Sequence, residues 1–402
     1  MDVETFESAA RFAEQCGADW RRTAQASPQA TVFQTWEWTE AWWQHHGGGG
    51  KRFRGLAFAE GGERVGFAAL FLPGAAAPLR TLRLAGTGGS DYLDIVAAPG
   101  HEAAVATAFF GWLAANRRAW DWADFQQVRP GAVLASCCCP TEGEGSGSGA
   151  AAAATAPPAG LRAECWPGET CPFLALPPGD WEAFRKTLGK KLRQNIGYYE
   201  RALEKQFRAE YRVATAETLA ADLEAFFALH QARWQRRWMP GAFAAEGARR
   251  FHADVAARLL AAGMLRLHTL LLDGQVRAAI YCFQKGERCY YYLGGFDPEL
   301  ARLSVGTVLT ARAIRHAIES DRATEFDFLR GDEPYKYRWG AQDRHNRRVS
   351  VTRGGSPRSA LLECAGRATL TLEMRLKTWM HRQHGGGGSS GGRKAGGEKH
   401  DG

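Results

Sequence analysis

The segment Glu325–Gly340, EFDFLRGDEPYKYRWG, holds a dense group of side chains that could transfer protons or bind a ligand. It opens as an alternating apolar strand and then becomes a loop that contains Asp332, Glu333 and Tyr335. Binding and catalytic residues concentrate on loops that a rigid sheet holds in place. The alternative is a solvated turn, but three aromatic side chains are unusual in so short a surface loop. We therefore predict a site here.

Asp327 lies within the predicted strand itself. An isolated buried carboxylate is costly unless a cation or hydrogen-bond donor compensates it. Clusters of opposite charges are also where perturbed pKa values and catalytic groups tend to occur. The cations that we expect to pair with Asp327 are Arg233, Arg330 or Lys336.

A second candidate site is the segment Gly294–Thr310, GGFDPELARLSVGTVLT, which joins a predicted strand to a predicted helix. Ser304 is suited to cap this helix, and Gly306 leaves its first turn open to close approach. The free N–H groups and the dipole of a helix start favour a phosphate. An ordinary capped helix has the same pattern, so the position between a meander and a parallel return strand is what favours a site.

The composition is that of a globular protein large enough for two domains. The chain has 402 residues, of which 45% are hydrophobic and 23% charged. The formal net charge of +8 favours an anionic partner. A phosphate-bearing cofactor, a nucleic acid and an acidic membrane surface all fit this charge.

Targeting signals and metal motifs are not evident. The acidic N-terminus lacks a signal-peptide pattern, and no apolar run is long enough for a transmembrane helix. The nine cysteines form no recognisable framework and include no CxxC pair. We therefore expect reduced thiols, a cytoplasmic location and no metal site.

The first third of the chain reads as a helical start followed by strands. Residues 1–46 are predicted to be helical, a hairpin covers 53–72, and strands follow over 79–84 and 91–96. A helix over 101–116 and a strand over 122–128 come next. The aromatic residues near the end of the helical start suit a core: Phe33, Trp36, Trp38, Trp42 and Trp43.

Residues 131–160 are of low complexity, which predicts a flexible insertion. We therefore expect a first domain over residues 1–130, a flexible linker over 131–168, a second domain over 169–382 and a disordered tail over 383–402.

The second half is predicted to start with the segment Phe173–Leu176, which a long basic helix follows from about Trp181 to 208, capped by Asp180. A helix over 215–238 carries His230 on its apolar stripe, where a core histidine is the default and a base the alternative. After a helix over 251–262, a three-stranded antiparallel meander covers 264–294. A helix over 304–319 leads into the strand over 325–329, and a last helix covers 361–379.

The two halves share an outline. Each has a hairpin, a Gly-Gly pair followed shortly by Asp, a helix and then an apolar strand. Chance is the alternative, because the matching stretches are short, but one core repeated twice would explain the outline.

Two stretches, YYYLGGFDPELARLSVGTVL and FDFLRGDEPYKYRW, together with the basic segment RKTLGKKLRQNIGYYERAL, resemble the bacterial acetyltransferases of the CelD type. These proteins are a branch of the GNAT superfamily linked to cellulose and exopolysaccharide biosynthesis. The resemblance covers residues 170–353 well and 30–130 more loosely.

The resemblance implies an α/β (α+β) fold of tandem GNAT-like domains, each a mixed, mostly antiparallel sheet flanked by helices. It implies acetyl-CoA or another acyl-CoA as the donor. The acyl-pantetheine arm would lie between strands 288–294 and 325–329, with the pyrophosphate on the start of helix 304–319. The implied cofactor-binding residues are Leu293, Gly294, Ser304, Val305, Gly306 and Thr307.

Acyl transfer to an amine needs a deprotonated nucleophile and a donor that holds the carbonyl oxygen. The candidate bases are His230, Asp327, Asp332 and Glu333, and Tyr335 is the candidate acid for the leaving thiolate. We assign six side chains to the acceptor: Arg233, Trp234, Arg330, Glu333, Lys336 and Trp339.

The expected function is acyl-CoA-dependent N- or O-acyl transfer to a sugar or amine in cell-envelope polysaccharide biosynthesis. The usual GNAT phosphate loop is not met, because Arg302 and Gly306 stand out of register. The paired-domain layout also resembles Fem-type transferases, which use aminoacyl-tRNA. A third reading is a non-catalytic module associated with a membrane polysaccharide synthase. We expect no DNA partner, and tRNA is less favoured than coenzyme A.

Overall fold

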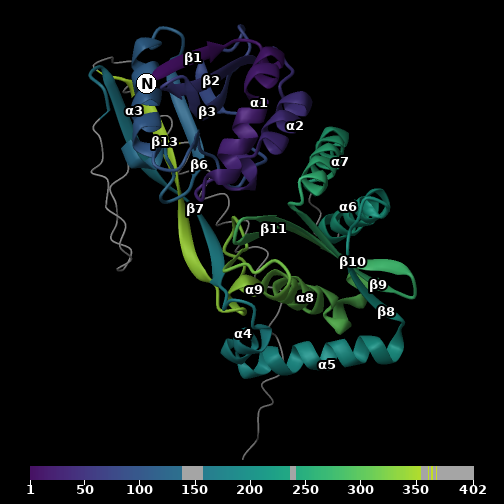
Figure 1. The fold of residues 1–402 in the computed structure, drawn as a ribbon. Helices are drawn as coiled ribbons and strands as arrows, with labels where there is room; N and C mark the ends of the chain where they lie inside the picture. Colours follow the sequence, from purple (N-terminus) through teal and green to yellow (C-terminus); the bar gives the residue numbers. More distant parts are fainter. Residues whose placement is uncertain (138–156, 236–240, 355–360, 362–363, 365–367, 369–402) are drawn as a thin grey trace, which may run out of the picture. The chain divides into compact units, whose positions relative to one another are not determined.

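One 13-stranded sheet runs through the described part of residues 1–353, which form one compact unit in the computed structural model (Figure 1). The structure describes residues 1–137, 157–235 and 241–354, and the single positions 361, 364 and 368. Most of the predicted linker (138–156), most of the predicted helix over 361–379 and the predicted tail lie outside the described residues. The strand order is β1-β2-β3-β4-β6-β13-β7-β12-β11-β10-β9-β8, with β5 paired to β3.

The elements of the first half are β1 (Asp2–Phe6), α1 (Ala9–Ala26), η1 (Val32–Gln34), α2 (Trp36–His46), β2 (Arg52–Glu60), β3 (Glu63–Leu72), β4 (Thr81–Leu84), β5 (Val96–Ala97), α3 (Glu102–Ala115), β6 (Trp122–Val128) and η2 (Ala135–Cys137). The predicted hairpin, helix and last strand of this half are confirmed. The predicted helical stretch over residues 1–46 is not continuous. It begins with the strand β1, and two separate helices, α1 and α2, follow. The predicted strand over 91–96 is wrong, since only Val96–Ala97 pair there.

The elements of the second half are β7 (Leu161–Ala175), α4 (Trp181–Thr187), α5 (Lys190–Gln206), β8 (Ala209–Val213), α6 (Leu219–Gln235), α7 (Glu246–Ala261), β9 (Leu265–Leu272), β10 (Gln275–Lys285), β11 (Arg288–Phe296), η3 (Pro298–Leu303), α8 (Val305–Glu319), β12 (Glu325–Asp327), α9 (Pro334–Tyr337) and β13 (Gln342–Arg353). The meander, the helix after it and the return strand are confirmed. The basic helix is not continuous, because Leu188 turns extended before Gly189 and separates α4 from α5.

The sheet consists of two halves with the same strand pattern. The order β1-β2-β3-β4-β6-β13 corresponds to β8-β9-β10-β11-β12-β7. Each half contains one parallel pair, β4 with β6 and β11 with β12, and a helix connects the two strands of each pair. This arrangement confirms the predicted mixed, mostly antiparallel sheet flanked by helices, and it matches the repeated outline in the sequence.

The halves are joined by an antiparallel pair, β7 with β13, that runs from Leu161–Arg353 to Phe173–Gln342. Residues 161–168, which we expected in the linker, form the first part of β7. The end of β13 also pairs with β6 of the first half, although we placed this segment in the second domain. The first half is therefore completed by β13, a strand that lies far away in the sequence.

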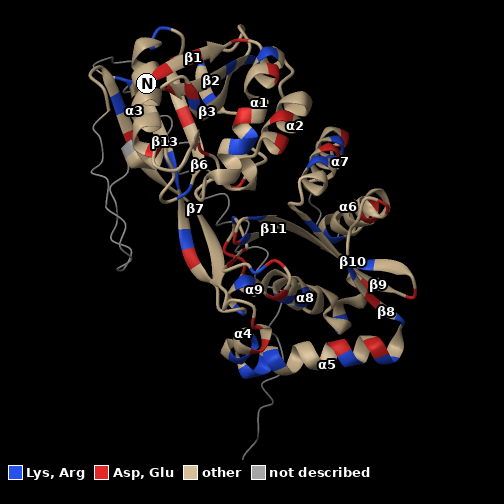
Figure 2. Cartoon of the chain, viewed as in Figure 1, with Lys and Arg blue, Asp and Glu red and all other residues tan. Residues whose placement is uncertain are grey.

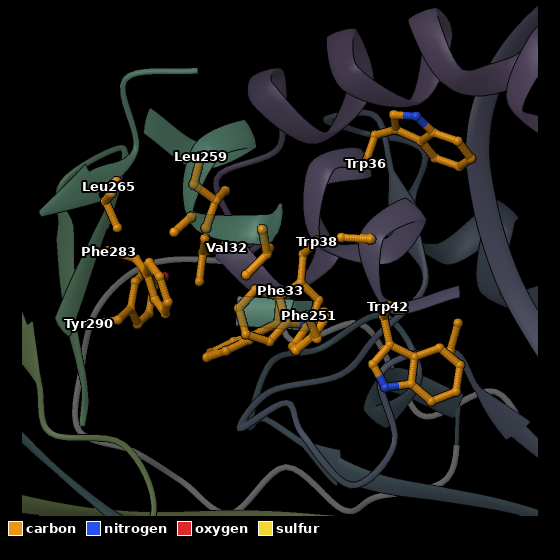
Figure 3. Packing of buried hydrophobic residues seen from close by; sticks show 14 of the residues in the cluster. Val32, Phe33, Trp36, Trp38, Trp42, Phe251, Leu259, Leu265, Phe283 and Tyr290 are labelled. Atoms are coloured by element: carbon orange, nitrogen blue, oxygen red, sulfur yellow. The ribbon is translucent and has the colours of Figure 1, made fainter. Parts of the chain in front are cut away.

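A hydrophobic core extends from the helices of the first half to the strands of the second (Figure 3). Phe33 is 1% exposed and its ring contacts Phe283 and Tyr290 of the second half. Trp38 is fully buried, and its indole N–H donates to the Ser90 hydroxyl at 2.8 Å. This hydrogen bond offsets the cost of burying the indole nitrogen. The predicted aromatic core is thus a junction between the halves.

Two further predictions concern membrane-spanning helices and the state of the cysteines. No helix of the described residues is long and apolar enough to cross a membrane. Cys165 in β7 is disulfide-bonded, so the expectation of reduced thiols is wrong at this position. The free cysteines among the described residues are Cys16, Cys171, Cys282, Cys289 and Cys364.

We predict that Phe33→Ala lowers the free energy of unfolding by about 3–5 kcal/mol, because it leaves a cavity where the halves meet. Urea unfolding measures this loss. Tyr198→Ala is the control, since Tyr198 is 61% exposed and its loss should change stability by no more than about 0.5 kcal/mol. Equal stability of the Phe33 variant and the wild type would show that the halves do not depend on this core.

Candidate functional site

β11 and β12 pair over only three positions and then separate. The parallel register runs from Arg288–Glu325 to Tyr290–Asp327, and beyond it β11 continues to Phe296 beside β10 alone. A register shift against β10 makes Tyr292 an extra residue in β11. Bulges of this kind change the direction of a strand and are frequent beside functional sites. The result is a gap at the carboxyl ends of two parallel strands.

A cavity of about 360 Å³ lies next to this gap, at the start of α8. Val305 and Gly306 are in the first turn of α8, where N–H groups have no acceptor within the helix. The dipole of the 15-residue helix adds partial positive charge at this end. The cavity is lined by Arg233, Phe296, Asp297, Pro298, Ala301, Ser304, Val305, Gly306 and Thr307.

Ser304 shapes the entrance to the helix through its backbone. It adopts a left-handed conformation with φ of 49°, and its carbonyl accepts from the N–H groups of Thr307 and Val308. Its side chain makes no capping hydrogen bond, so the predicted capping by the Ser304 hydroxyl is wrong. The helix start is therefore left to other donors and to any ligand in the cavity.

Phe296 and Arg233 form one wall of the cavity. A Cβ added to Gly306 would lie 3.1 Å from the Phe296 ring, so the glycine allows β11 to approach α8. The Arg233 guanidinium lies 5.5 Å from the centre of the same ring and donates to the Gly294 carbonyl at 3.4 Å. The cavity thus combines a helix start with a fixed cation, a combination that suits an anionic ligand.

Two phenols, Tyr291 of β11 and Tyr335 of α9, lie close to this wall. Their hydroxyl groups act on each other's pKa, and the charges of Arg233 and Glu333 act on both. Burial raises the pKa of each phenol above its usual value. Both therefore remain protonated at neutral pH and can donate a hydrogen bond or a proton. Tyr291 was not identified from the sequence, because an aromatic residue in a strand reads as core.

Asp327 is fully buried at the last paired position of β12. Its carboxylate accepts from the Tyr92 hydroxyl at 2.7 Å, from Arg344 at 3.0 Å and from the Leu329 N–H at 2.7 Å. Burial raises its pKa to about 6, although the Arg344 charge lowers it. The expected pairing with Arg233, Arg330 or Lys336 is wrong, and Arg344 of β13 supplies the cation.

Arg344 holds two carboxylates at once. It pairs with Glu325 at 2.7 Å as well as with Asp327, and its guanidinium lies 4.1 Å from the centre of the Phe173 ring. Tyr92 reaches this network from the first half of the chain. Asp327 therefore anchors the junction of the halves.

The loop after β12 is closed by Lys336, which is 2% exposed. Its ammonium group donates to the carbonyls of Leu329, Arg330 and Gly331 at 2.8–3.2 Å and pairs with Glu333 at 2.9 Å. These contacts stabilise a sharp turn, in which Leu329 and Gly331 both have positive φ. The structure thus gives Lys336 a structural role in place of the acceptor contact that we assigned to it.

Of the other residues predicted for this loop, some are buried or ion-paired and one is exposed at the surface. Arg330 forms ion pairs with Asp91 of the first half and with Glu169. Trp339 is 4% exposed within the core of the second half, whereas Asp332 is exposed. Of the predicted catalytic residues, Tyr335 lies close to the cavity wall, and the charge of Glu333 acts on it.

His230 lies in an aromatic core on α6 and is 1% exposed. Its Nε2 accepts from the Trp234 indole at 3.0 Å, and burial lowers its pKa to about 4. A Cβ on Gly295 would lie 2.7 Å from the His230 backbone nitrogen, so α6 packs directly against β11. His230 and Trp234 therefore support the wall that carries Arg233. Leu293 packs against the core that joins the halves and does not line the cavity.

Comparison with known proteins agrees with this layout. Residues 190–337 match the family model described as an acetyltransferase (GNAT) domain. This range contains the cavity, both phenols and the diverging strands. No curated protein sequence matches the chain.

Solved structures share the fold over most of the chain. FemX is 11% identical, with a TM-score of 0.57, and the match covers 86% of this chain and 96% of that one. The C-terminal domain of a putative lysylphosphatidylglycerol synthetase from Agrobacterium fabrum is 16% identical, with a TM-score of 0.52 and coverages of 89% and 96%. A conserved protein of unknown function from Bacteroides thetaiotaomicron is 9% identical, with a TM-score of 0.52 and coverages of 88% and 100%.

We predict that Arg344→Met destabilises the protein in a pH-dependent way. Without Arg344, the pKa of Asp327 in the folded state rises further, whereas its pKa in the unfolded state stays at about 4. A carboxyl whose pKa is raised by folding stabilises the folded protein fully when the pH is below its pKa in the unfolded state. This stabilisation is lost as the pH rises toward its pKa in the folded state. The loss should be about 3–5 kcal/mol at pH 8 and clearly smaller at pH 5.

Urea unfolding at the two pH values provides the measurement for this prediction. Arg338→Met is the control, because Arg338 is exposed in the same region of the chain. A loss that is equal at both pH values would contradict the role given to Asp327.

Proposed function

We propose that this protein transfers an acyl group from acyl-coenzyme A to an amine or hydroxyl of its acceptor. The main observation that supports this proposal is the cavity at the start of α8, beside the gap between β11 and β12. It lies within the residues that match an acetyltransferase (GNAT) domain. A fixed cation, free N–H groups and an open strand edge are what a pyrophosphate with a pantetheine arm requires.

The donor would bind with its pyrophosphate at the first turn of α8. Val305 and Gly306 supply N–H groups, Thr307 lines the same wall, and the side chain of Arg233 adds positive charge at the rim. The pantetheine arm would extend along the edge of β11, whose backbone groups beyond Tyr290 have no partner strand on the β12 side among the described residues. This placement leads the thioester toward the phenols of Tyr291 and Tyr335.

The chemistry would break the carbon–sulfur bond of the thioester and form a carbon–nitrogen or carbon–oxygen bond to the acceptor. The acceptor's proton passes to a carboxylate, for which Glu333 is the closest candidate to the phenols. Backbone N–H groups at the edge of β11 can hold the carbonyl oxygen as negative charge develops. Tyr335 donates its proton toward the leaving thiolate, and Tyr291 holds the Tyr335 hydroxyl in position.

For the acceptor we propose a sugar or amine of cell-envelope polysaccharide metabolism, which rests on the resemblance to CelD-type proteins. A cytoplasmic location beside a membrane polysaccharide synthase would fit that role. Assays with radiolabelled acetyl-coenzyme A and a panel of amino sugars and polyols would identify the acceptor.

A second candidate donor is aminoacyl-tRNA. Figure 2 shows Lys and Arg positions (blue) gathered along α4 and the start of α5. The exposed lysines of this region are Lys186, Lys190 and Lys191. α5 packs against η3 and α8, which border the cavity. A polyanion on this surface could present its end to the same gap. Binding isotherms for coenzyme A and for tRNA separate the two donors, and an accessory module would bind neither.

We predict that Thr307→Asp weakens coenzyme A binding at least tenfold and keeps the fold. A carboxylate at this position repels phosphate, yet it favours the first turn of a helix. Gly306→Asp is a less clean test, because its side chain would meet Phe296. Titration calorimetry gives the affinity, and Gly247→Asp, an exposed first-turn position of α7, controls for added charge. Unchanged affinity in the folded Thr307 variant would exclude the cavity as the donor site.

We also predict that Tyr335→Phe lowers turnover at least tenfold while coenzyme A affinity stays within about twofold. Positioned acids contribute roughly a hundredfold or more to rate, and this phenol does not line the phosphate cavity. Steady-state kinetics beside a binding isotherm provide the test. The matched control is Tyr337→Phe on the same short helix, whose hydroxyl donates to Asp343. Full activity of the Tyr335 variant would remove it from the mechanism.

A further inference from the structure

Three cationic side chains gather at the turn end of the β10–β11 hairpin, far from the cavity. Lys285 and Arg288 are direct cross-strand partners beside the turn, and Arg129 follows β6 of the first half. All three are partly exposed. Like charges that face each other across a hairpin are unfavourable unless something compensates them.

The internal partners of these cations are mostly backbone carbonyls. Lys285 donates to the Ser27 carbonyl at 3.2 Å, and Arg288 donates to the Pro28 carbonyl at 2.8 Å. Arg129 lies 5.9 Å from the centre of the Tyr92 ring. Carbonyl dipoles compensate a full positive charge only in part.

Glu287 stands in the hairpin turn, and Asp94 and Glu325 lie near enough for the Arg129 charge to act on them, but few close ion pairs form within this group. Across the described ranges, no ion pair joins Arg129 or Lys285 to an Asp or Glu. Arg288 approaches Glu325 at 3.7 Å, but Glu325 is already held at 2.7 Å by Arg344. Arg129 and Lys285 therefore have no close carboxylate partner within the described residues, and Arg288 shares its partner with Arg344.

Tyr290 adds an independent observation. It lies two residues after Arg288, on the same face of β11, and is fully buried. Its hydroxyl has no hydrogen-bond partner within the described part of the chain. An unpaired buried hydroxyl costs about 1–3 kcal/mol. The positive charges of Arg129 and Arg288 act on this hydroxyl more strongly than any other charge does.

We infer that Arg129, Lys285, Arg288 and Tyr290 form a binding site for one anionic group, a phosphate or a carboxylate. We call these residues the hairpin cluster. The bound anion would accept from the cations and from the Tyr290 hydroxyl. It would also tie the end of β6 and the loop after α1 to the β10–β11 hairpin, and so link the two halves.

The ionisation of Lys285 is consistent with a missing counterion. Burial, together with the charges of Arg288 and Arg129, lowers its pKa to about 8. An anion between these side chains would raise that pKa and reduce the fraction of reactive free amine. Glu325 and Asp327 are the carboxylates that face Tyr290 from the neighbouring strand.

The hairpin cluster is separate from the donor cavity. Arg288 begins β11 and Gly294 stands six residues later, which is about 20 Å along a strand. The inference does not rest on the proposed function, and the two can fail independently.

The experiment uses the full chain with Thr307→Asp, so that phosphate does not bind at α8. Melting temperature and calorimetric affinity are measured with sodium phosphate and with sodium acetate, each against sodium chloride at equal ionic strength. We expect millimolar or tighter binding of one anion and a higher melting temperature. Arg129→Gln and Lys285→Gln should each weaken binding at least tenfold, whereas the exposed Arg11→Gln should not.

Two further readouts separate a binding site from a merely structural cluster. Tyr290→Phe should leave the anion-free protein as stable or more stable, because it removes an unpaired hydroxyl, yet weaken anion binding at least fivefold. The bound anion should also slow amine labelling of Lys285, followed by mass spectrometry, but not of exposed Lys186. Absence of binding by both anions, or equal affinity in Arg129→Gln, Tyr290→Phe and the parent, would overturn the inference.

Discussion

The buried carboxylate of Asp327 is the constraint around which the structure is arranged. It stands where β11 and β12 stop pairing, and it requires both the Arg344 guanidinium and the Tyr92 hydroxyl. Arg344 comes from the strand that joins the halves, and Tyr92 comes from the first half. An unpaired charge at this depth would cost several kcal/mol, so the network fixes how the two sheets meet. This contact between the two halves of the sheet in turn keeps the end of β11 apart from β12.

The bulge in β11 connects this junction to the candidate site. Tyr292, the extra residue, donates to the Gly89 carbonyl of the first half at 2.8 Å. On the opposite face, Tyr291 points toward Tyr335 and Arg233. The bulge in β11 thus places the Tyr292 phenol at the junction of the halves and the Tyr291 phenol close to the cavity. The first half therefore contributes to the site by positioning β11, although it supplies no residue of the cavity lining.

Local patterns predicted the elements around the cavity well. The Asp-Gly turn, the helical spacing after Ser304 and the alternating strand are short-range signals. The meander, α8 and β12 follow them closely, although the Ser304 hydroxyl does not cap α8. Long-range pairing was not predictable. β7 begins directly after the low-complexity segment, in residues that we assigned to the linker, and β13 opens with the polar run QDRHN. Asp327 has partners 17 and 235 positions away, which no spacing rule connects. Lys336 looked like a ligand-binding cation because its three acceptors are backbone carbonyls, which a sequence does not mark.

Hydrogen–deuterium exchange with and without coenzyme A tests the central claim most directly, namely that the donor lies at the start of α8 in the gap between β11 and β12. The account predicts slower exchange confined to residues 291–310, with the hairpin cluster and α2 unchanged. Protection that misses this range, whether it falls on α4 and α5 alone or on the junction of the halves, would contradict it.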